Sequence, residues 1–124
     1  MKTLPPNCGD AEMRRQRAQI RSWLHIAADD ATLDIYAGKR LTPRFGWNCA
    51  MELQADDGRH FIYAEDICPT SIAVVCKAVI KPGTIVALRR DEPEPWVQAR
   101  VVQITETLGG FRTGLIFVAG PDWD

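Results

Sequence analysis

Histidine is scarce in this sequence, and cysteine pairs with metal-binding spacing are missing. The chain has two histidines, His25 and His60, and four cysteines, with no C-x-x-C pair among them. Because zinc sites need clustered Cys and His ligands, we expect no metal and no cofactor. The isolated histidines do not complete a Ser–His–Asp arrangement, and no paired acids or glycine-rich phosphate loop frame a pocket. We therefore expect that the protein is not an enzyme.

Long apolar runs are missing too. No stretch approaches the roughly 18 residues of a membrane span, and the N-terminus lacks the charged-then-apolar order of a signal peptide. Cys49 and Cys76 stand among apolar residues, as small buried side chains do in a reducing compartment. We expect a cytoplasmic protein with no membrane span.

Neither sign of charge is in strong excess. The 15 basic and 16 acidic residues give a formal net charge of −1, so we expect no nucleic-acid binding through bulk phosphate attraction. Residues 1–44 nevertheless carry 8 basic and 5 acidic side chains, against 7 and 11 in residues 45–124. An anionic ligand or partner is therefore expected to dock at the N-terminal arm.

The N-terminal region predicts one amphipathic helix over about residues 11–28, after a loose leader at 1–9. Asp10 can cap this helix, and apolar residues recur at helical spacing along one stripe. The stripe comprises Met13, Ile20, Leu24 and Ala27, with Trp23 near its edge and Arg14, Arg15, Arg17 and Arg21 on the other faces. The basic face is either solvated or a partner or membrane surface. The stripe must be covered by the rest of the chain, by a partner, or by a second copy in a homodimer.

From Gly46 onward the apolar period changes to two, which is typical of half-buried strands. A first strand from Gly46 is followed by strands at 59–67, 72–79, 84–90, 96–106 and 111–118, joined mainly by turns rich in Asp, Pro and Gly. Six strands with no helical period among them predict a mainly β fold. We expect an antiparallel barrel or strongly curled sheet, preceded by the helix.

Two short segments carry the functional signal. Arg40-Leu-Thr-Pro-Arg44 places two guanidinium groups on a non-helical arm, because Pro43 disfavours the helical region for the residue before it. Each guanidinium can fork two donors onto phosphate oxygens or onto the O6/N7 edge of guanine. Asp66, at the end of a strand, can accept from the N1 and N2 donors of guanine. The alternative is that the arginines make only surface salt bridges.

In these segments the chain resembles the PilZ domain, a bacterial family of six-stranded β-barrels that bind cyclic di-GMP (c-di-GMP). The resemblance covers about residues 38–119. Arg40 and Arg44 match the R-x-x-x-R motif, and residues 66–71 align with D/N-x-S-x-x-G. It implies a PilZ-like barrel domain at 38–124 after a leader, helix and linker at 1–37. It also implies a c-di-GMP site formed by Arg40, Arg44, Asp66, Cys68 and Ser71.

Two residues depart from the second motif. Cys68 replaces a serine, so a hydroxyl contact worth about 0.5–1.5 kcal/mol is largely lost. Ser71 replaces a glycine, so it must either avoid positive φ or carry the strain of adopting it. The intact arginine pair favours a receptor that relays c-di-GMP binding to an unknown protein effector. The altered turn favours an adaptor that binds no nucleotide and acts by protein–protein contact in pilus, flagellar or secretion machinery.

Overall fold

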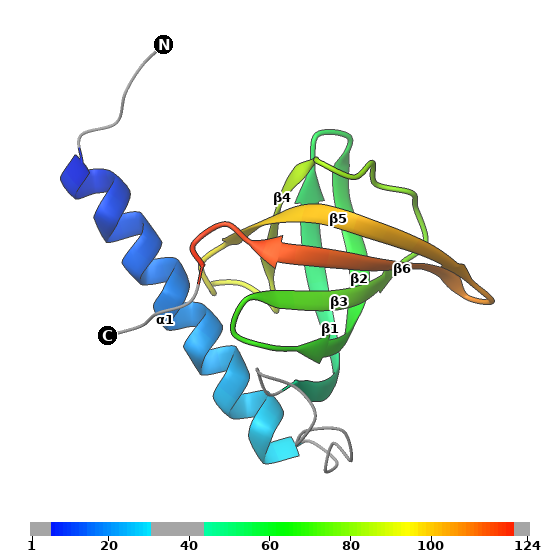
Figure 1. Cartoon of the computed structure of the whole chain (residues 1–124), viewed down its shortest axis with the longest axis horizontal. Coiled ribbons are helices and arrows are strands. Elements are labelled where there is room, and N and C mark those ends of the chain that lie inside the picture. Colours follow the sequence, from blue (N-terminus) through cyan, green and yellow to red (C-terminus); the bar gives the residue numbers. More distant parts are fainter. Residues whose placement is uncertain (1–5, 31–43, 121–124) are drawn as a thin grey trace.

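A helix and six strands make up the fold (Figure 1), which a computed structural model describes for residues 6–30 and 44–120. The elements in chain order are α1 (Pro6–Asp30), β1 (Phe45–Ala55), β2 (Gly58–Ile67), β3 (Ser71–Cys76), β4 (Ile85–Arg89), β5 (Val97–Thr107) and β6 (Gly110–Phe117). The strands form a closed antiparallel barrel in the order β1-β2-β3-β6-β5-β4. The expected mainly β barrel with an N-terminal helix is confirmed.

The barrel closes where β1 meets β4. Residues Glu52–Gln54 pair there with Ala87–Arg89, whereas β1 pairs with β2 along almost its whole length. Inward-facing residues alternate with outward-facing ones and fill the interior, as expected for a small barrel. Those with no exposed surface include Leu53, Ile67, Val74, Leu88, Val97, Val101 and Leu115.

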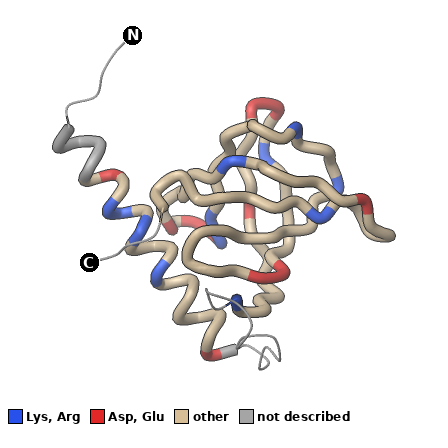
Figure 2. Tube along the Cα trace, in the orientation of Figure 1, with Lys and Arg blue, Asp and Glu red and all other residues tan. Residues whose placement is uncertain are grey.

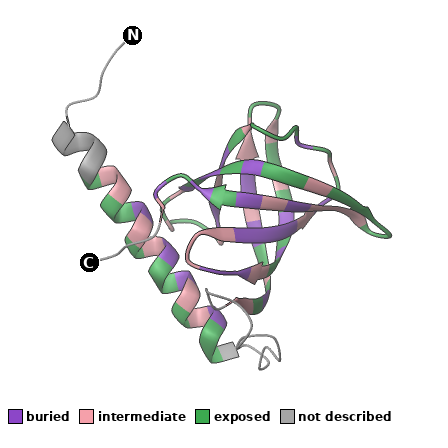
Figure 3. Ribbon diagram, in the orientation of Figure 1, coloured by how far each residue is buried: buried purple, intermediate pink, exposed green. Residues whose placement is uncertain are grey.

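Helix α1 lies against one end of this barrel, at the side where β1 and β5 begin and β6 ends (Figure 1). Its buried positions face the strands (Figure 3), and Ile20, Trp23 and Ala27 belong to the same apolar core as the barrel interior. Its basic positions lie between residues 14 and 21, in the middle of the helix (Figure 2). The predicted stripe is therefore covered by the chain's own barrel.

The helix differs from the expectation in two respects. It begins at Pro6 rather than near residue 11, so Asp10 lies inside it and residues 6–9 are not a loose leader. Proline suits a first helical position because its missing N–H would have no partner there. Trp23, expected at the edge of the stripe, is fully buried at its centre.

Strand β3 is shorter than expected. β3 ends at Cys76 rather than continuing to Val79. Cys76 pairs with Phe111, and β6 begins only one residue earlier, so β6 offers no partner beyond Lys77. The chain instead leaves the sheet and buries Ile80 in the core before the turn to β4.

Among the described residues, no helix has the length and apolar character needed to span a bilayer.

Candidate functional site

The register between β1 and β2 brings two of the predicted motif residues to one end of the barrel. Phe45 pairs with Ile67, and Gly46 pairs with Asp66. Arg44 immediately precedes β1, so it lies beside the end of β2. Continuing the register places it opposite Cys68, the first residue of the turn after β2. Its partner in the motif, Arg40, falls outside the described residues. Among those that are described, Arg44, Asp66, Cys68 and Ser71 come together at this end.

The turn between β2 and β3 is tight. The backbone N–H of Cys68 donates to the carbonyl of Ser71 over 2.9 Å, and the reverse bond spans 3.4 Å, which leaves two residues in the loop. The carbonyl of Thr70 accepts from the N–H of Phe117 at 2.9 Å, so the turn is also fixed to the end of β6. Ser71 does not adopt positive φ, and the strain considered for this position is not present.

The thiol of Cys68 points into this turn and not toward solvent. Its sulfur lies 3.1 Å from Ser71 Oγ and 3.5 Å from Thr70 Oγ1, and the residue is buried. Burial opposes ionisation, but the side-chain and backbone hydrogen bonds from Ser71 and Thr70 outweigh it and lower the pKa of the thiol below its ordinary value. Cys68 therefore acts first as a partner for the neighbouring hydroxyls.

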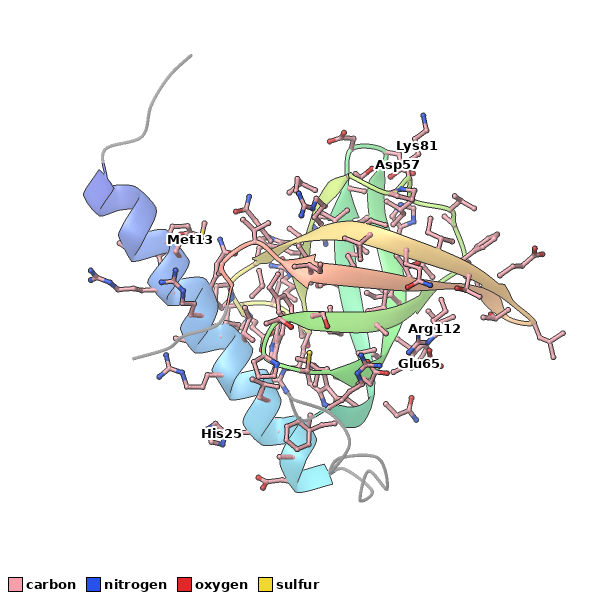
Figure 4. All side chains as sticks on the ribbon, in the orientation of Figure 1. Met13, His25, Asp57, Glu65, Lys81 and Arg112 are labelled. Atoms are coloured by element: carbon pink, nitrogen blue, oxygen red, sulfur yellow. The ribbon has the colours of Figure 1, made fainter. Side chains whose placement is uncertain are left out.

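Asp66 is held by an arginine that the sequence motif does not contain. Arg112, on β6, donates from Nη2 to Asp66 Oδ2 over 2.9 Å and from Nε to Glu65 Oε1 over 2.8 Å. Figure 4 shows Glu65 and Arg112 side by side on the barrel surface. Among the described residues, none donates a hydrogen bond to the second oxygen of Asp66. Within the described part of the chain, one carboxylate oxygen is thus engaged and the other has no donor.

A β-bulge explains why two consecutive acids reach the same arginine. Ala64 pairs with Val74 and Asp66 with Ala73, so Glu65 is an extra residue relative to β3. Consecutive residues of a regular strand face opposite sides, but a bulge breaks this alternation. Ala64 and Ile67 are buried on the inside, whereas Glu65 and Asp66 both face outward.

Helix α1 is fastened to the same end of the barrel by polar contacts as well as apolar ones. Gln16, which is buried, accepts from the N–H of Gln98 over 2.8 Å and donates to its side chain over 3.3 Å. Arg17 Nε donates to the carbonyl of Ala119 over 3.1 Å. The ring of Trp23 lies 6.0 Å from that of Trp47. The helix, the start of β1 and the end of β6 thus form one packed unit beside the candidate site.

Sequence reasoning missed Arg112, Glu65 and Gln16 as parts of this region. The two consecutive acids between Ala64 and Ile67 interrupt the period of two, which was a sequence signal for the bulge. The pairing of β3 with β6 had no sequence signal. In the described part of the chain, no group of three or more His, Cys, Asp or Glu side chains is placed to hold a metal ion.

Comparison with known proteins gives a likeness in structure only. No protein-family profile and no curated protein matches the sequence. The crystal structure of YcgR from Escherichia coli in complex with c-di-GMP matches with a TM-score of 0.50 and 14% identity, over 64% of this chain and 38% of YcgR. The chain has a PilZ-like fold. The K. pneumonia MrkH–c-di-GMP complex matches with a TM-score of 0.49 and 16% identity, over 63% of this chain and 43% of MrkH. The PilZ-like chain thus spans less than half of either protein.

Proposed function

We propose that this PilZ-like chain is a receptor domain for c-di-GMP. The observation that carries the proposal is the β1–β2 register, which sets Arg44 beside the end of β2 that carries Asp66 and beside the turn that follows it. A cation and a carboxylate at one strand end match the phosphate and the guanine edge of such a ligand. The likeness of the barrel to YcgR, which was solved with c-di-GMP, supports the same assignment.

Each residue has a distinct role in this proposal. Arg40 and Arg44 each donate two parallel hydrogen bonds to the phosphates or to the O6/N7 edge of guanine. Asp66 accepts from guanine N1–H and N2–H through the oxygen that Arg112 leaves unused. Cys68 and Ser71 line the turn beneath the ligand, and their side chains are hydrogen-bonded to each other.

The output of binding would pass through the helix to a protein effector. Arg44 and the polar contacts of α1 lie at the same end of the barrel, so a ligand gathered by the arginine arm sits next to the docked helix. We expect the domain to act in the cytoplasm and without catalysis. A homodimer through α1 would have to use its exposed face, because the barrel covers its apolar stripe.

Isothermal titration calorimetry with c-di-GMP tests the proposal, with GTP as the control ligand. We expect saturable binding of c-di-GMP in the micromolar range, about −8 kcal/mol, that weakens as salt rises. GTP should bind at least about tenfold more weakly. A flat trace with c-di-GMP, from protein that melts cooperatively, contradicts the receptor assignment.

The second candidate is an adaptor that binds no nucleotide. Arg112 already engages Asp66, and the Cys68 thiol is used within the turn, which leaves fewer groups for a ligand than the complete motif would offer. A flat titration would select this function, with protein–protein contact in pilus, flagellar or secretion machinery as its setting.

A further inference from the structure

A groove lies along the first half of β2, away from the turn at the other end of that strand. Its volume is about 600 Å³, and its lining includes Arg59, Phe61, Tyr63, Val75 and Lys77. The groove exists because β3 leaves the sheet at Cys76 while β2 extends further. The wall of the barrel is therefore incomplete at this place.

The β2 backbone has no strand partner on the groove side before Tyr63, whose pairing with Val75 is the last one between β2 and β3. Ala55 and Gly58 flank a two-residue turn and form a hydrogen-bonded pair, so by alternation the Leu53–His60 pair is hydrogen-bonded too. The N–H and C=O groups of Arg59 and Phe61 then point away from β1. None of the backbone hydrogen bonds outside the strand ladders involves either residue. An edge of this kind is a template for an added strand.

The side chains around the edge are apolar and exposed to an unusual degree. Phe61 is 81% exposed and Tyr63 is 59% exposed, although both are aromatic. Val79 and Leu108, which follow Ala78 and precede Gly109 of the lining in sequence, are exposed too. Large exposed apolar groups gathered in one place mark an interaction surface. The free backbone edge beside them restricts the partner to an extended segment.

The charge of the groove distinguishes between a second copy of the chain and an acidic segment as its ligand. The residues that line the groove include the cations Arg59 and Lys77 and no Asp or Glu. Lys77 is exposed and makes no ion pair with any described residue, while Arg59 contacts Glu52 at 3.3 Å. A second copy of the chain would bring the same cations together, and like charges across paired strands destabilise. An acidic segment is favoured instead.

We propose that the β2 edge at Arg59–Ile62 binds an extended acidic segment of another protein by strand addition. Apolar residues of the segment contact Phe61 and Tyr63. Its carboxylates form ion pairs with Lys77 and Arg59, and its backbone forms hydrogen bonds with that of Arg59 and Phe61. This assignment does not depend on nucleotide binding. It concerns the opposite end of β2 from the turn that contains Cys68.

Titration of the isotopically labelled protein with a capped peptide, Ac-Glu-Val-Glu-Val-Glu-Val-Glu-amide, tests this site by NMR. We expect saturable shifts at β2 residues 58–63 and a dissociation constant on the order of 100 µM. The amides of Arg59 and Phe61 should exchange fast in the free protein and become protected in the complex. Phe61→Ala or Lys77→Glu should weaken binding about tenfold, whereas Lys81→Glu, an equal charge change outside the groove, should not.

Three control peptides complete the test. Each control peptide should bind at least about tenfold more weakly than the test peptide. The first has the same composition with its valines and glutamates in separate blocks, the second has lysines in place of glutamates, and the third is N-methylated at alternate residues. Equal binding of the N-methylated peptide overturns strand addition, and equal binding of the lysine peptide overturns the acidic partner. Absence of saturable shifts overturns the site. A concentration-dependent dimer that Phe61→Ala abolishes would assign the edge to a second copy instead.

Discussion

Trp23 of α1 donates its indole N–H to Glu94 Oε1 over 3.0 Å, and so joins the helix to the loop between β4 and β5. The same carboxylate accepts from the backbone N–H of Arg90 at 2.7 Å and from its Nε at 2.9 Å. The indole ring also packs 6.4 Å from Phe117. One fully buried side chain thus holds the helix, the loop and the end of β6 in a fixed arrangement.

Replacing this tryptophan tests how far the barrel depends on the helix. Trp23→Ala should lower the free energy of unfolding by about 3–5 kcal/mol, because it leaves a cavity in the shared core. Trp23→Phe keeps most of the packing but leaves Glu94 without one donor, so we expect a smaller loss of about 1–3 kcal/mol. Urea unfolding measures both values. Equal stability of all three proteins would mean that the helix is a separate appendage.

The arginine arm should control nucleotide binding without supporting the fold. Arg40→Ala and Arg44→Ala should each weaken c-di-GMP binding at least about tenfold, since charge-assisted bonds are the stronger contacts. Neither should shift the melting temperature appreciably. Arg14→Ala, at an exposed position of α1, is the matched control and should bind like the parent. Parent-like titrations for both arm variants would place the site elsewhere.

Arg112 should act as a positioning residue for Asp66. Arg112→Ala frees the carboxylate to rotate, and we expect c-di-GMP affinity to fall about three- to tenfold while stability changes by less than about 1 kcal/mol. Arg112→Lys should recover only part of the affinity, because lysine does not fork between two carboxylates. Tighter binding by the alanine variant would show that Arg112 competes with the ligand.

The turn variants should separate the effect of the hydroxyl from that of the glycine. Cys68→Ser places a hydroxyl on the partners that the buried thiol already has, Ser71 and Thr70, so calorimetry should show a change in c-di-GMP affinity of less than about threefold. Ser71→Gly relieves no strain, because Ser71 does not have positive φ. It should instead cost about 0.5–1 kcal/mol of stability through backbone entropy. A large gain in affinity from the glycine alone would contradict this account.

Gly110 should be the least replaceable glycine among those described. Its φ is +148°, and a Cβ added there would lie 2.7 Å from the carbonyl oxygen of Cys76. Gly110→Ala should therefore destabilise by about 1–3 kcal/mol in thermal or urea unfolding. Gly46→Ala is the matched control, since a Cβ there meets no atom within 4 Å. Equal losses in the two variants would show that the close approach to β3 is not what matters.

The strand pattern could be predicted because it depends on local periodicity. The alternation from Trp47 to Leu53 matches the observed burial, and the Asp56-Asp57 turn lies where its residues indicated. The start of the helix was missed because Pro6 is compatible with both a loop and a first helical turn. The full burial of Trp23 depends on contacts with Trp47 and Phe117, which are distant in sequence.

The candidate site was predictable only in part. The motif residues near Asp66 could be located, since the turn follows from the proline and the flanking strands. The bond from Arg112 could not, because it depends on the β3–β6 pairing as well as on the bulge at Glu65. For the same reason the free edge at Phe61 had no sequence signal, as it arises from β3 ending before its neighbour does.

The bulge at Glu65 also determines where this chain can change in length. An added residue at the exposed Asp56-Asp57 or Leu108-Gly109 turns would leave the side chains of every strand on their present face of the sheet. Removing Glu65 would do the same, because Ala64, Asp66 and Ile67 would then follow one another in regular alternation, facing inward, outward and inward. A deletion in the regular part of β2 would instead move side chains to the wrong face of the sheet. Glu65 is thus a position where β2 should lose a residue at little cost to the fold, apart from the contact of Glu65 with Arg112.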